Sequence, residues 1–137
     1  MTADVITLTI DDREVQVPRG STVLQACESI GVEIPTLCAD PRLKPIGACR
    51  MCVVEVQPGP PRPTASCTTP AADGQTVITD SKSIRDIRRH VIELQLQHHP
   101  LDCPYCDQAG TCELQDETFA QDIHQSPYET VPKAHPE

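Results

Sequence analysis

Seven of the eight cysteines of this 137-residue chain, together with one histidine, fall into two groups with the spacing of metal ligands. The first group has the spacing C-x10-C-x2-C-x14-C and consists of Cys38, Cys49, Cys52 and Cys67. The second has the spacing H-x3-C-x2-C-x5-C and consists of His99, Cys103, Cys106 and Cys112. An iron–sulfur cluster is a compact core whose irons each take a terminal ligand, usually a cysteine thiolate. The spacing therefore favours bound clusters and electron transfer.

The first group places two cysteines close together in the chain and two further away. The two residues between Cys49 and Cys52 let a tight turn present both sulfurs to one small core. The small residues Gly47 and Ala48 let backbone N–H groups approach the sulfides, and such hydrogen bonds stabilise a reduced cluster. Plant-type ferredoxins have four residues in the first gap, where this chain has ten, so we expect a longer wrapping loop after Cys38.

The second group combines three thiolates with one imidazole, a set that suits a [4Fe–4S] cluster with one unusual ligand. Replacing a thiolate by a neutral imidazole removes a negative charge, which raises the reduction potential. It also adds a possible protonation, because imidazole titrates near neutrality. His98 competes with His99 for this role; the other interpretation of His98 is a polar residue at the C-terminal end of a helix.

Structural zinc is the alternative for both groups. Zinc takes four cysteines, or three cysteines and a histidine, and often uses a C-x2-C pair. Zinc sites more often contain two such pairs, and the first group has only one. With zinc, the chain would be a non-redox adaptor stapled by metal.

The composition points to a small core and limits the kinds of partner. The chain has one Phe, two Tyr and no Trp, with 14 prolines, so we expect it to bury little apolar surface. Small cores of this kind commonly need a metal or a covalent staple. Its formal net charge of −9 argues against nucleic-acid binding. No segment approaches the ~20 apolar residues of a membrane span, so we expect no direct membrane insertion. Residues 1–17 alternate apolar and polar side chains and include acidic ones, so they do not form a secretory signal. This predicts a reducing, cytoplasmic compartment, in which the cysteines are ligands rather than disulfide partners.

Periodicity predicts a small mixed sheet with one helix packed across it over residues 1–80. Alternating residues predict strands at 5–10 and 15–17 around an acidic turn. Ser21 is expected to cap a helix over residues 22–30 that ends at Gly31. Cys27 lies in that helix, outside both groups, and is expected to be a buried apolar residue. Further strands are predicted at 52–56, 64–68 and 76–79.

After residue 80 the pattern changes to helical. Ser81 or Ser83 is expected to start a helix that Pro100 terminates, with an apolar face at Ile84, Ile87, Val91 and Leu94. Its early half is basic, which indicates a solvated face or a docking surface for an acidic partner; these residues are Lys82, Arg85, Arg88 and Arg89. A short helix is expected at 113–119. We therefore predict domains at 1–80 and 81–120 and an extended tail at 121–137.

Two stretches of sequence resemble a known family. They are IPTLC…GACRMCVVEV…TASCTTPAADGQTV, within residues 34–77, and RRHVIELQLQHHPLDCPYCDQAGTCELQD, residues 88–116. Together they resemble the N-terminal region of the large iron–sulfur subunit of NADH:quinone oxidoreductase, respiratory complex I. Similar segments occur in NAD-linked formate dehydrogenases and in the diaphorase part of NAD-reducing hydrogenases.

The resemblance implies an α+β fold, in which a β-grasp, ferredoxin-like domain is followed by a small helical segment. It implies one [2Fe–2S] cluster held by the first group and one [4Fe–4S] cluster held by the second. The family's histidine stands four residues before its first cysteine, so His99 rather than His98 inherits the ligand role.

The resemblance also implies a relay function. Electrons would come from a flavin-bearing, NADH-oxidising subunit and pass to a downstream cluster-bearing or catalytic subunit, in a complex at the inner face of the membrane. No G-x-G-x-x-G run opens a helix, so we expect no flavin or nicotinamide site, no catalytic residues and no complete substrate site in this chain. The family's further cluster motifs are missing here, which makes the chain either a segment of a larger subunit or a small subunit.

Overall fold

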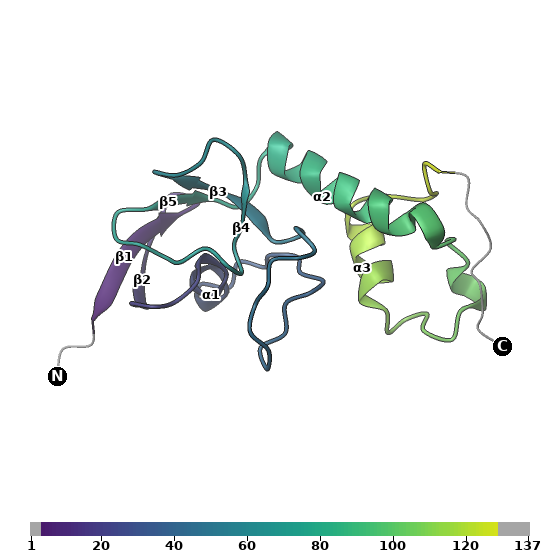
Figure 1. Cartoon of the computed structure of the whole chain (residues 1–137), viewed down its shortest axis with the longest axis horizontal. Coiled ribbons are helices and arrows are strands. Elements are labelled where there is room, and N and C mark those ends of the chain that lie inside the picture. The colour runs from purple at the N-terminus through teal and green to yellow at the C-terminus, as the bar shows by residue number, and fades with distance from the viewer. Residues whose placement is uncertain (1–3, 129–137) are drawn as a thin grey trace. The chain divides into compact units, whose positions relative to one another are not determined.

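The structure is a computed structural model that describes residues 4–128. Its contacts divide the chain into two compact units, Met1–Arg85 and Asp86–Glu137. The division falls inside one helix, five residues after the boundary that the sequence predicts. Figure 1 shows the strands gathered in the first unit, whereas the second is helical.

A β-hairpin begins the first unit, as predicted. Strands β1 (Val5–Ile10) and β2 (Arg13–Pro18) pair antiparallel, and Ile6, Leu8 and Ile10 are buried. Two aspartates form the turn with positive φ angles, 47° at Asp11 and 67° at Asp12. Two left-handed residues match the twist of a two-residue hairpin, and Asp tolerates this conformation better than most residues.

Three shorter strands complete the sheet: β3 (Val53–Gln57), β4 (Thr64–Ala65) and β5 (Thr76–Ile78). The strand order is β2-β1-β5-β3-β4, with β1 and β5 parallel and the other pairs antiparallel. The predicted mixed sheet is therefore confirmed. Strand β4 is shorter than the predicted 64–68, because Thr68 and Thr69 both donate to the Ala65 carbonyl and turn the chain away.

Helix α1 (Val23–Ser29) packs on this sheet (Figure 1). The predicted cap, Ser21, is wrong. Thr22 is the N-cap, because its hydroxyl accepts from the Gln25 N–H while the Gln25 side chain accepts from the Thr22 N–H, at 3.2 and 2.9 Å. This reciprocal pair is a capping box. Cys27 of α1 is fully buried in the core, as predicted, and burial raises the pKa of its thiol to about 11.

Helix α2 (Lys82–Gln95) begins after Ser81, whose hydroxyl accepts from the Ile84 N–H at 3.2 Å. Its buried stripe follows steps of four residues: Ile84, Arg88, Ile92 and, just beyond the helix, Leu96. Leu94 is therefore exposed, and its predicted place on the apolar face is wrong. Arg88 is only 8% exposed, so the basic residues do not form a single solvated face.

The second unit continues with a 3-10 turn at Leu96–His98, another at Cys103–Tyr105, and helix α3 (Glu113–Ala120). In α3, burial raises the pKa of Glu117, while the Arg88 charge opposes that rise. Beyond α3, residues 121–128 have no helix or strand, but Ile123 is buried and the Ser126 hydroxyl donates to the Leu96 carbonyl. The rest of the predicted tail, 129–137, lies outside the described residues.

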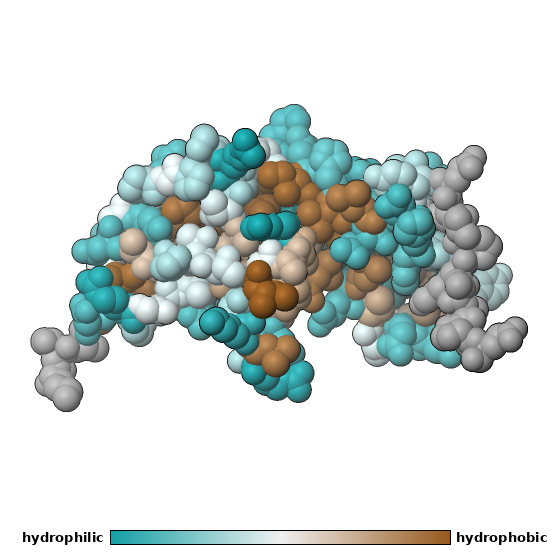
Figure 2. Space-filling model, viewed as in Figure 1, coloured by the Kyte–Doolittle hydropathy of each residue, from teal (hydrophilic) through white to brown (hydrophobic). Residues whose placement is uncertain are grey.

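The face that Figure 2 draws is largely hydrophilic, with hydrophobic residues gathered in a few places. Among the described residues 4–128, the exposed large apolar ones are Val5, Leu43, Ile46, Leu94, Tyr105, Phe119 and Tyr128. No helix within residues 4–128 has both the length and the apolar character that a membrane span needs.

The capping box of α1 predicts unequal effects at two adjacent positions. Thr22→Ala should lower the free energy of unfolding by about 1 kcal/mol, because the Gln25 N–H loses its acceptor. Ser21→Ala should change it by less than about 0.5 kcal/mol, since only the Ser21 backbone has hydrogen-bond partners in the described structure. Urea denaturation of both variants checks this, and an equal loss in both would contradict the assignment of the cap.

Candidate metal centres

The first group of cysteines lies where the sheet meets the long loop after α1. Cys52 directly precedes β3, and Cys67 follows two residues after β4. Both are about 1% exposed and belong to the hydrophobic core. Cys38 and Cys49 lie in the loop and are half-buried. The structure thus supplies two thiols from the core and two from the loop.

Electrostatic interactions link these four thiols. Burial raises the pKa of Cys67 to about 11, aided by a hydrogen bond with Cys52 and by the charges of Cys52 and Cys38. Burial also raises the pKa of Cys49, but hydrogen bonds outweigh it and leave the net pKa below its usual value. These bonds come from the N–H groups of Met51, Cys38 and Leu37 and from the Cys38 thiol. Each thiol therefore interacts with at least one other in the group.

Backbone N–H groups surround these sulfurs. The Met51 N–H lies 3.5 Å from the Cys49 Sγ, and Gly47 donates a backbone hydrogen bond to Cys67. Gly47 has a φ of 66°, and a Cβ added there would meet the Thr68 side chain at 3.2 Å. The loop can thus approach the Cys67 segment closely only because residue 47 is glycine. Thiolate ligands with N–H donors aimed at them fit an anionic iron–sulfur cluster.

Ser66 connects the elements that carry the two buried cysteines. Its N–H and its hydroxyl both donate to the Cys52 carbonyl, at 3.1 and 2.6 Å. Its own carbonyl accepts from the Leu24 N–H of α1 at 3.0 Å. The side chain is completely buried. Sequence reasoning missed this residue, whose only signal was its position next to Cys67.

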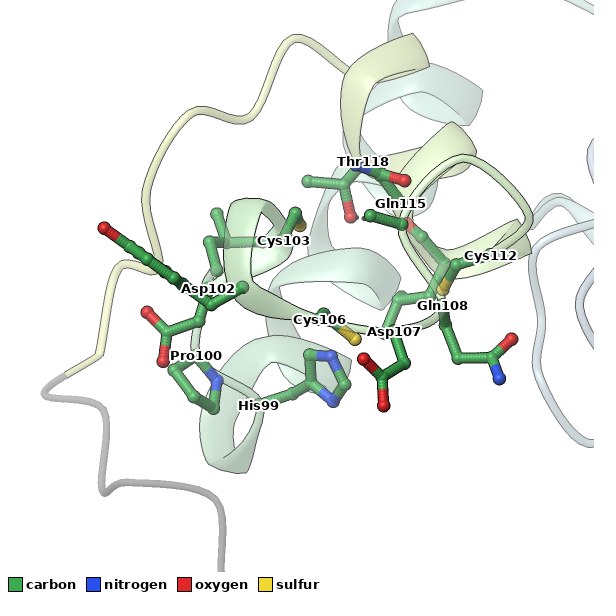
Figure 3. A pocket seen from close by; sticks show the side chains of 14 residues that line it. His99, Pro100, Asp102, Cys103, Cys106, Asp107, Gln108, Cys112, Gln115 and Thr118 are labelled. Atoms are coloured by element: carbon green, nitrogen blue, oxygen red, sulfur yellow. Dashed lines mark hydrogen bonds between the residues drawn. The ribbon is translucent and has the colours of Figure 1, made fainter.

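The second group lines a cavity of about 380 Å³ in the helical unit. Figure 3 shows His99, Cys103, Cys106 and Cys112 around it. His98 is not among the lining residues. The spacing alone allows either histidine as the ligand, whereas the cavity favours His99. Among residues 4–128, no three Cys, His, Asp or Glu side chains lie close enough together to hold a single metal ion, so neither group is as tight as a mononuclear site.

Short turns and a helix end position these four side chains. His99 follows the Leu96–His98 turn in an extended conformation, and its N–H donates to the Leu96 carbonyl. Cys103 begins the next 3-10 turn, where the Cys106 N–H donates to the Cys103 carbonyl at 3.1 Å. Cys112 is the N-cap residue of α3. The three cysteines are therefore held by local backbone turns rather than by a sheet.

The cavity wall also contains residues that sequence reasoning missed. Gln115 and Thr118 line it from α3, and Asp102 and Asp107 flank the cysteines in the chain. Gln115 and Thr118 follow Cys112 at steps of three, so they share its side of the helix. This spacing from Cys112 is the feature of the sequence that could have identified Gln115 and Thr118 as cavity residues.

The fold and the two groups of ligands define an iron–sulfur protein, and comparison with known families agrees. The family described as "2Fe-2S iron-sulfur cluster binding domain" matches residues 3–82, and the chain belongs to this family. The family described as "NADH-ubiquinone oxidoreductase-G iron-sulfur binding region" matches residues 88–127. The predicted β-grasp, ferredoxin-like domain followed by a helical cluster-binding segment is confirmed, as are one [2Fe–2S] and one [4Fe–4S] cluster as its cofactors. These matches favour iron–sulfur clusters over structural zinc.

Individual relatives agree with this classification. The chain is 50% identical over 117 residues to the mitochondrial NADH dehydrogenase [ubiquinone] iron-sulfur protein 1 of Solanum tuberosum, covering 85% of this chain and 16% of the relative. It is 49% identical over 115 residues to a subunit of the NADH-quinone oxidoreductase of Rickettsia bellii, covering 84% and 17%. The chain thus spans about a sixth of the length of these curated relatives.

A solved structure gives the same fold. The crystal structure of an NAD⁺-reducing [NiFe]-hydrogenase in the H2-reduced state superposes with a TM-score of 0.85 at 32% identity. The match covers 96% of this chain and 55% of the hydrogenase chain.

The hydrogen bonds of Ser66 predict that it stabilises the first group of cysteines. Ser66→Ala should lower the free energy of unfolding by about 1 kcal/mol, because a buried hydroxyl-to-carbonyl bond is lost. Ser29→Ala is the matched control, since Ser29 is an exposed residue and its hydroxyl donates within its own helix, to the Ala26 carbonyl. Thermal melts of both variants measure the difference. A loss at Ser66 no larger than that at Ser29 would count against this role.

Proposed function

We propose that this chain is an electron-transfer module of a multi-subunit NADH-linked oxidoreductase, specifically NADH:quinone oxidoreductase. One observation carries the proposal: each compact unit contains one group of ligands and matches one iron–sulfur family, at residues 3–82 and 88–127. The relatives named as NADH dehydrogenase and NADH-quinone oxidoreductase proteins support the parent complex.

The ligands proposed for the [2Fe–2S] cluster are Cys38, Cys49, Cys52 and Cys67. Their mutual electrostatic interactions and the surrounding N–H donors support this set. The ligands proposed for the [4Fe–4S] cluster are His99, Cys103, Cys106 and Cys112, which line one cavity. Cys27 is excluded from both sets because the charges that act on its thiol come from Asp11 and Glu28 and not from another cysteine.

When bound, each cluster accepts and releases one electron. The chain's own residues set the conditions for that exchange. The burial of Cys52 and Cys67 keeps water from two sulfurs, and the N–H groups of Gly47 and Met51 offset negative charge at the sulfurs they face. Such hydrogen bonds favour the reduced state and raise the potential.

The proposed partners are a flavin-bearing, NADH-oxidising subunit and a downstream cluster-bearing or catalytic subunit. The loop that contains Cys38 and Cys49 also carries Leu43 and Ile46, which are 69% and 73% exposed. Exposed apolar residues beside a redox site suit docking to another protein. We place the module in the cytoplasm, held at the inner face of the membrane through its complex.

A second candidate function is the same relay within an NAD⁺-reducing hydrogenase. The superposition with such an enzyme over 96% of this chain favours it. Affinity purification of the natural complex distinguishes the two. A membrane arm co-purifying with a flavoprotein supports the quinone-reducing complex, whereas a nickel–iron subunit supports the hydrogenase.

The relay proposal predicts two independent redox signals. Protein purified without oxygen should contain about six irons per chain, two plus four, and give two EPR signals during a reductive titration. Cys52→Ala should lose the [2Fe–2S] signal only. Cys27→Ala, the matched control at an equally buried cysteine, should keep both signals. Colourless protein containing zinc, or unchanged signals in Cys52→Ala, would reject the proposal or its ligand set.

The proposed histidine ligand predicts a change in potential. His99→Cys should keep the [4Fe–4S] cluster but lower its midpoint potential, because a thiolate adds negative charge to the site. His98→Cys is the control, since His98 does not line the cavity, and its potential should match the wild type. Potentiometric titration followed by EPR measures both. An unchanged or raised potential in His99→Cys would contradict the assignment.

A further inference from the structure

The five residues between Cys106 and Cys112 form a spacer, and local hydrogen bonds alone stabilise its conformation only weakly. Within it, the Ala109 N–H donates to the Cys106 carbonyl and the Thr111 N–H donates to the Gln108 carbonyl, at 3.1 and 3.0 Å. Within the second of these turns, Gly110 has a φ of 86°, in the left-handed region. A chain segment closed only by turns of this kind has many alternative conformations.

One side chain ties this spacer to a helix. The Gly110 N–H donates to the Gln115 Oε1 at 2.9 Å. Gln115 lies in α3, whose first residue follows Cys112 directly, and it also lines the cavity (Figure 3). The hydrogen bond therefore links the spacer to helix α3, which begins directly after Cys112.

Helix α3 is a firm support for this tether. Thr118 is fully buried, and its hydroxyl donates to the Leu114 carbonyl at 2.6 Å. The carbonyl of Gln121, at the end of the helix, accepts from Arg89 Nη1 of α2 at 3.1 Å. The Gln115 side chain is thus fixed at its base, and its amide oxygen holds Gly110 at a defined distance from Cys112.

We propose that Gln115 is a positioning residue for the cluster ligands Cys106 and Cys112. By holding Gly110, it keeps the five-residue spacer in the conformation that presents both thiols to the cavity before a cluster is bound. This inference rests on the function proposed above. It requires only an oxygen acceptor at the reach of a glutamine side chain, so glutamate satisfies it, whereas leucine does not, and asparagine is one methylene too short.

Four variants of the full chain, purified without oxygen, test the role. They are Gln115→Leu, Gln115→Asn, Gln115→Glu and, as the matched control, Gln108→Leu. Gln108 lines the same cavity, but only its backbone carbonyl has hydrogen-bond partners in the described structure. Hydrogen exchange by mass spectrometry follows the peptide covering residues 107–112, iron analysis follows cluster content, and EPR follows the reduced [4Fe–4S] signal.

Gln115→Leu should speed exchange at the spacer about fivefold, the factor that the loss of one ordinary hydrogen bond produces. Its [4Fe–4S] signal should broaden, and iron should be lost from that site at least about twofold faster in air. Gln115→Glu should restore all three measurements, and Gln108→Leu should match the wild type. If Gln115→Leu is too unstable to purify, Gln115→Asn carries the same expectation.

Two results would overturn the inference. One is a Gln115→Leu or Gln115→Asn variant that matches Gln108→Leu in exchange, iron content and signal. The other is a failure of Gln115→Glu to restore the signal. A wild-type chain that gives no [4Fe–4S] signal would instead refute the proposed function, and the inference would fall with it.

Discussion

The first unit depends on one constraint: two of its four candidate cluster ligands are also part of its hydrophobic core. Cys52 and Cys67 belong to the same buried cluster as the apolar residues of β1, β3 and α1. With few aromatic side chains available, the core is too small to stand apart from the site. Assembly of the site and folding of the sheet are therefore coupled, as is usual when a metal centre holds a small domain together.

This coupling explains why hydrogen bonds gather around the two buried cysteines. Unpaired polar groups in so thin a core would be costly, because each loses its contact with water. Ser66 satisfies this requirement by donating twice to the Cys52 carbonyl, and Leu24 of α1 donates to Ser66 in return. Gly47 completes the arrangement by letting the loop come close to Thr68 and to the sulfur of Cys67.

The helical unit positions its candidate ligands in a different way. Its four candidate ligands lie on turns around a cavity, and Cys106 is exposed. Support comes from α3 and from single side chains such as Gln115 rather than from a sheet. Because solvent exposure and hydrogen bonds to sulfur both tune cluster potentials, two such different environments suit two centres of different potential in one electron path.

Much of this organisation follows from the sequence alone. Cysteine spacing predicted the two groups of candidate ligands, and hydrophobic periodicity predicted the hairpin, the mixed sheet and three helices. Local chemistry also predicted that Cys27 would be buried. The hairpin and the helices depend on residues that are near one another in the chain, where spacing translates directly into geometry.

Tertiary structure decided what depends on contacts between distant segments. It put Arg88 on the buried stripe of α2, near Glu117 of α3, and shortened β4 where the chain turns toward the cysteines. It brought His99 rather than His98 to the cavity, and it gave Ser66 and Gln115 their hydrogen-bond partners. A serine or glutamine acquires such a role only when folding brings an acceptor or donor within about 3 Å, and no local pattern encodes that distance.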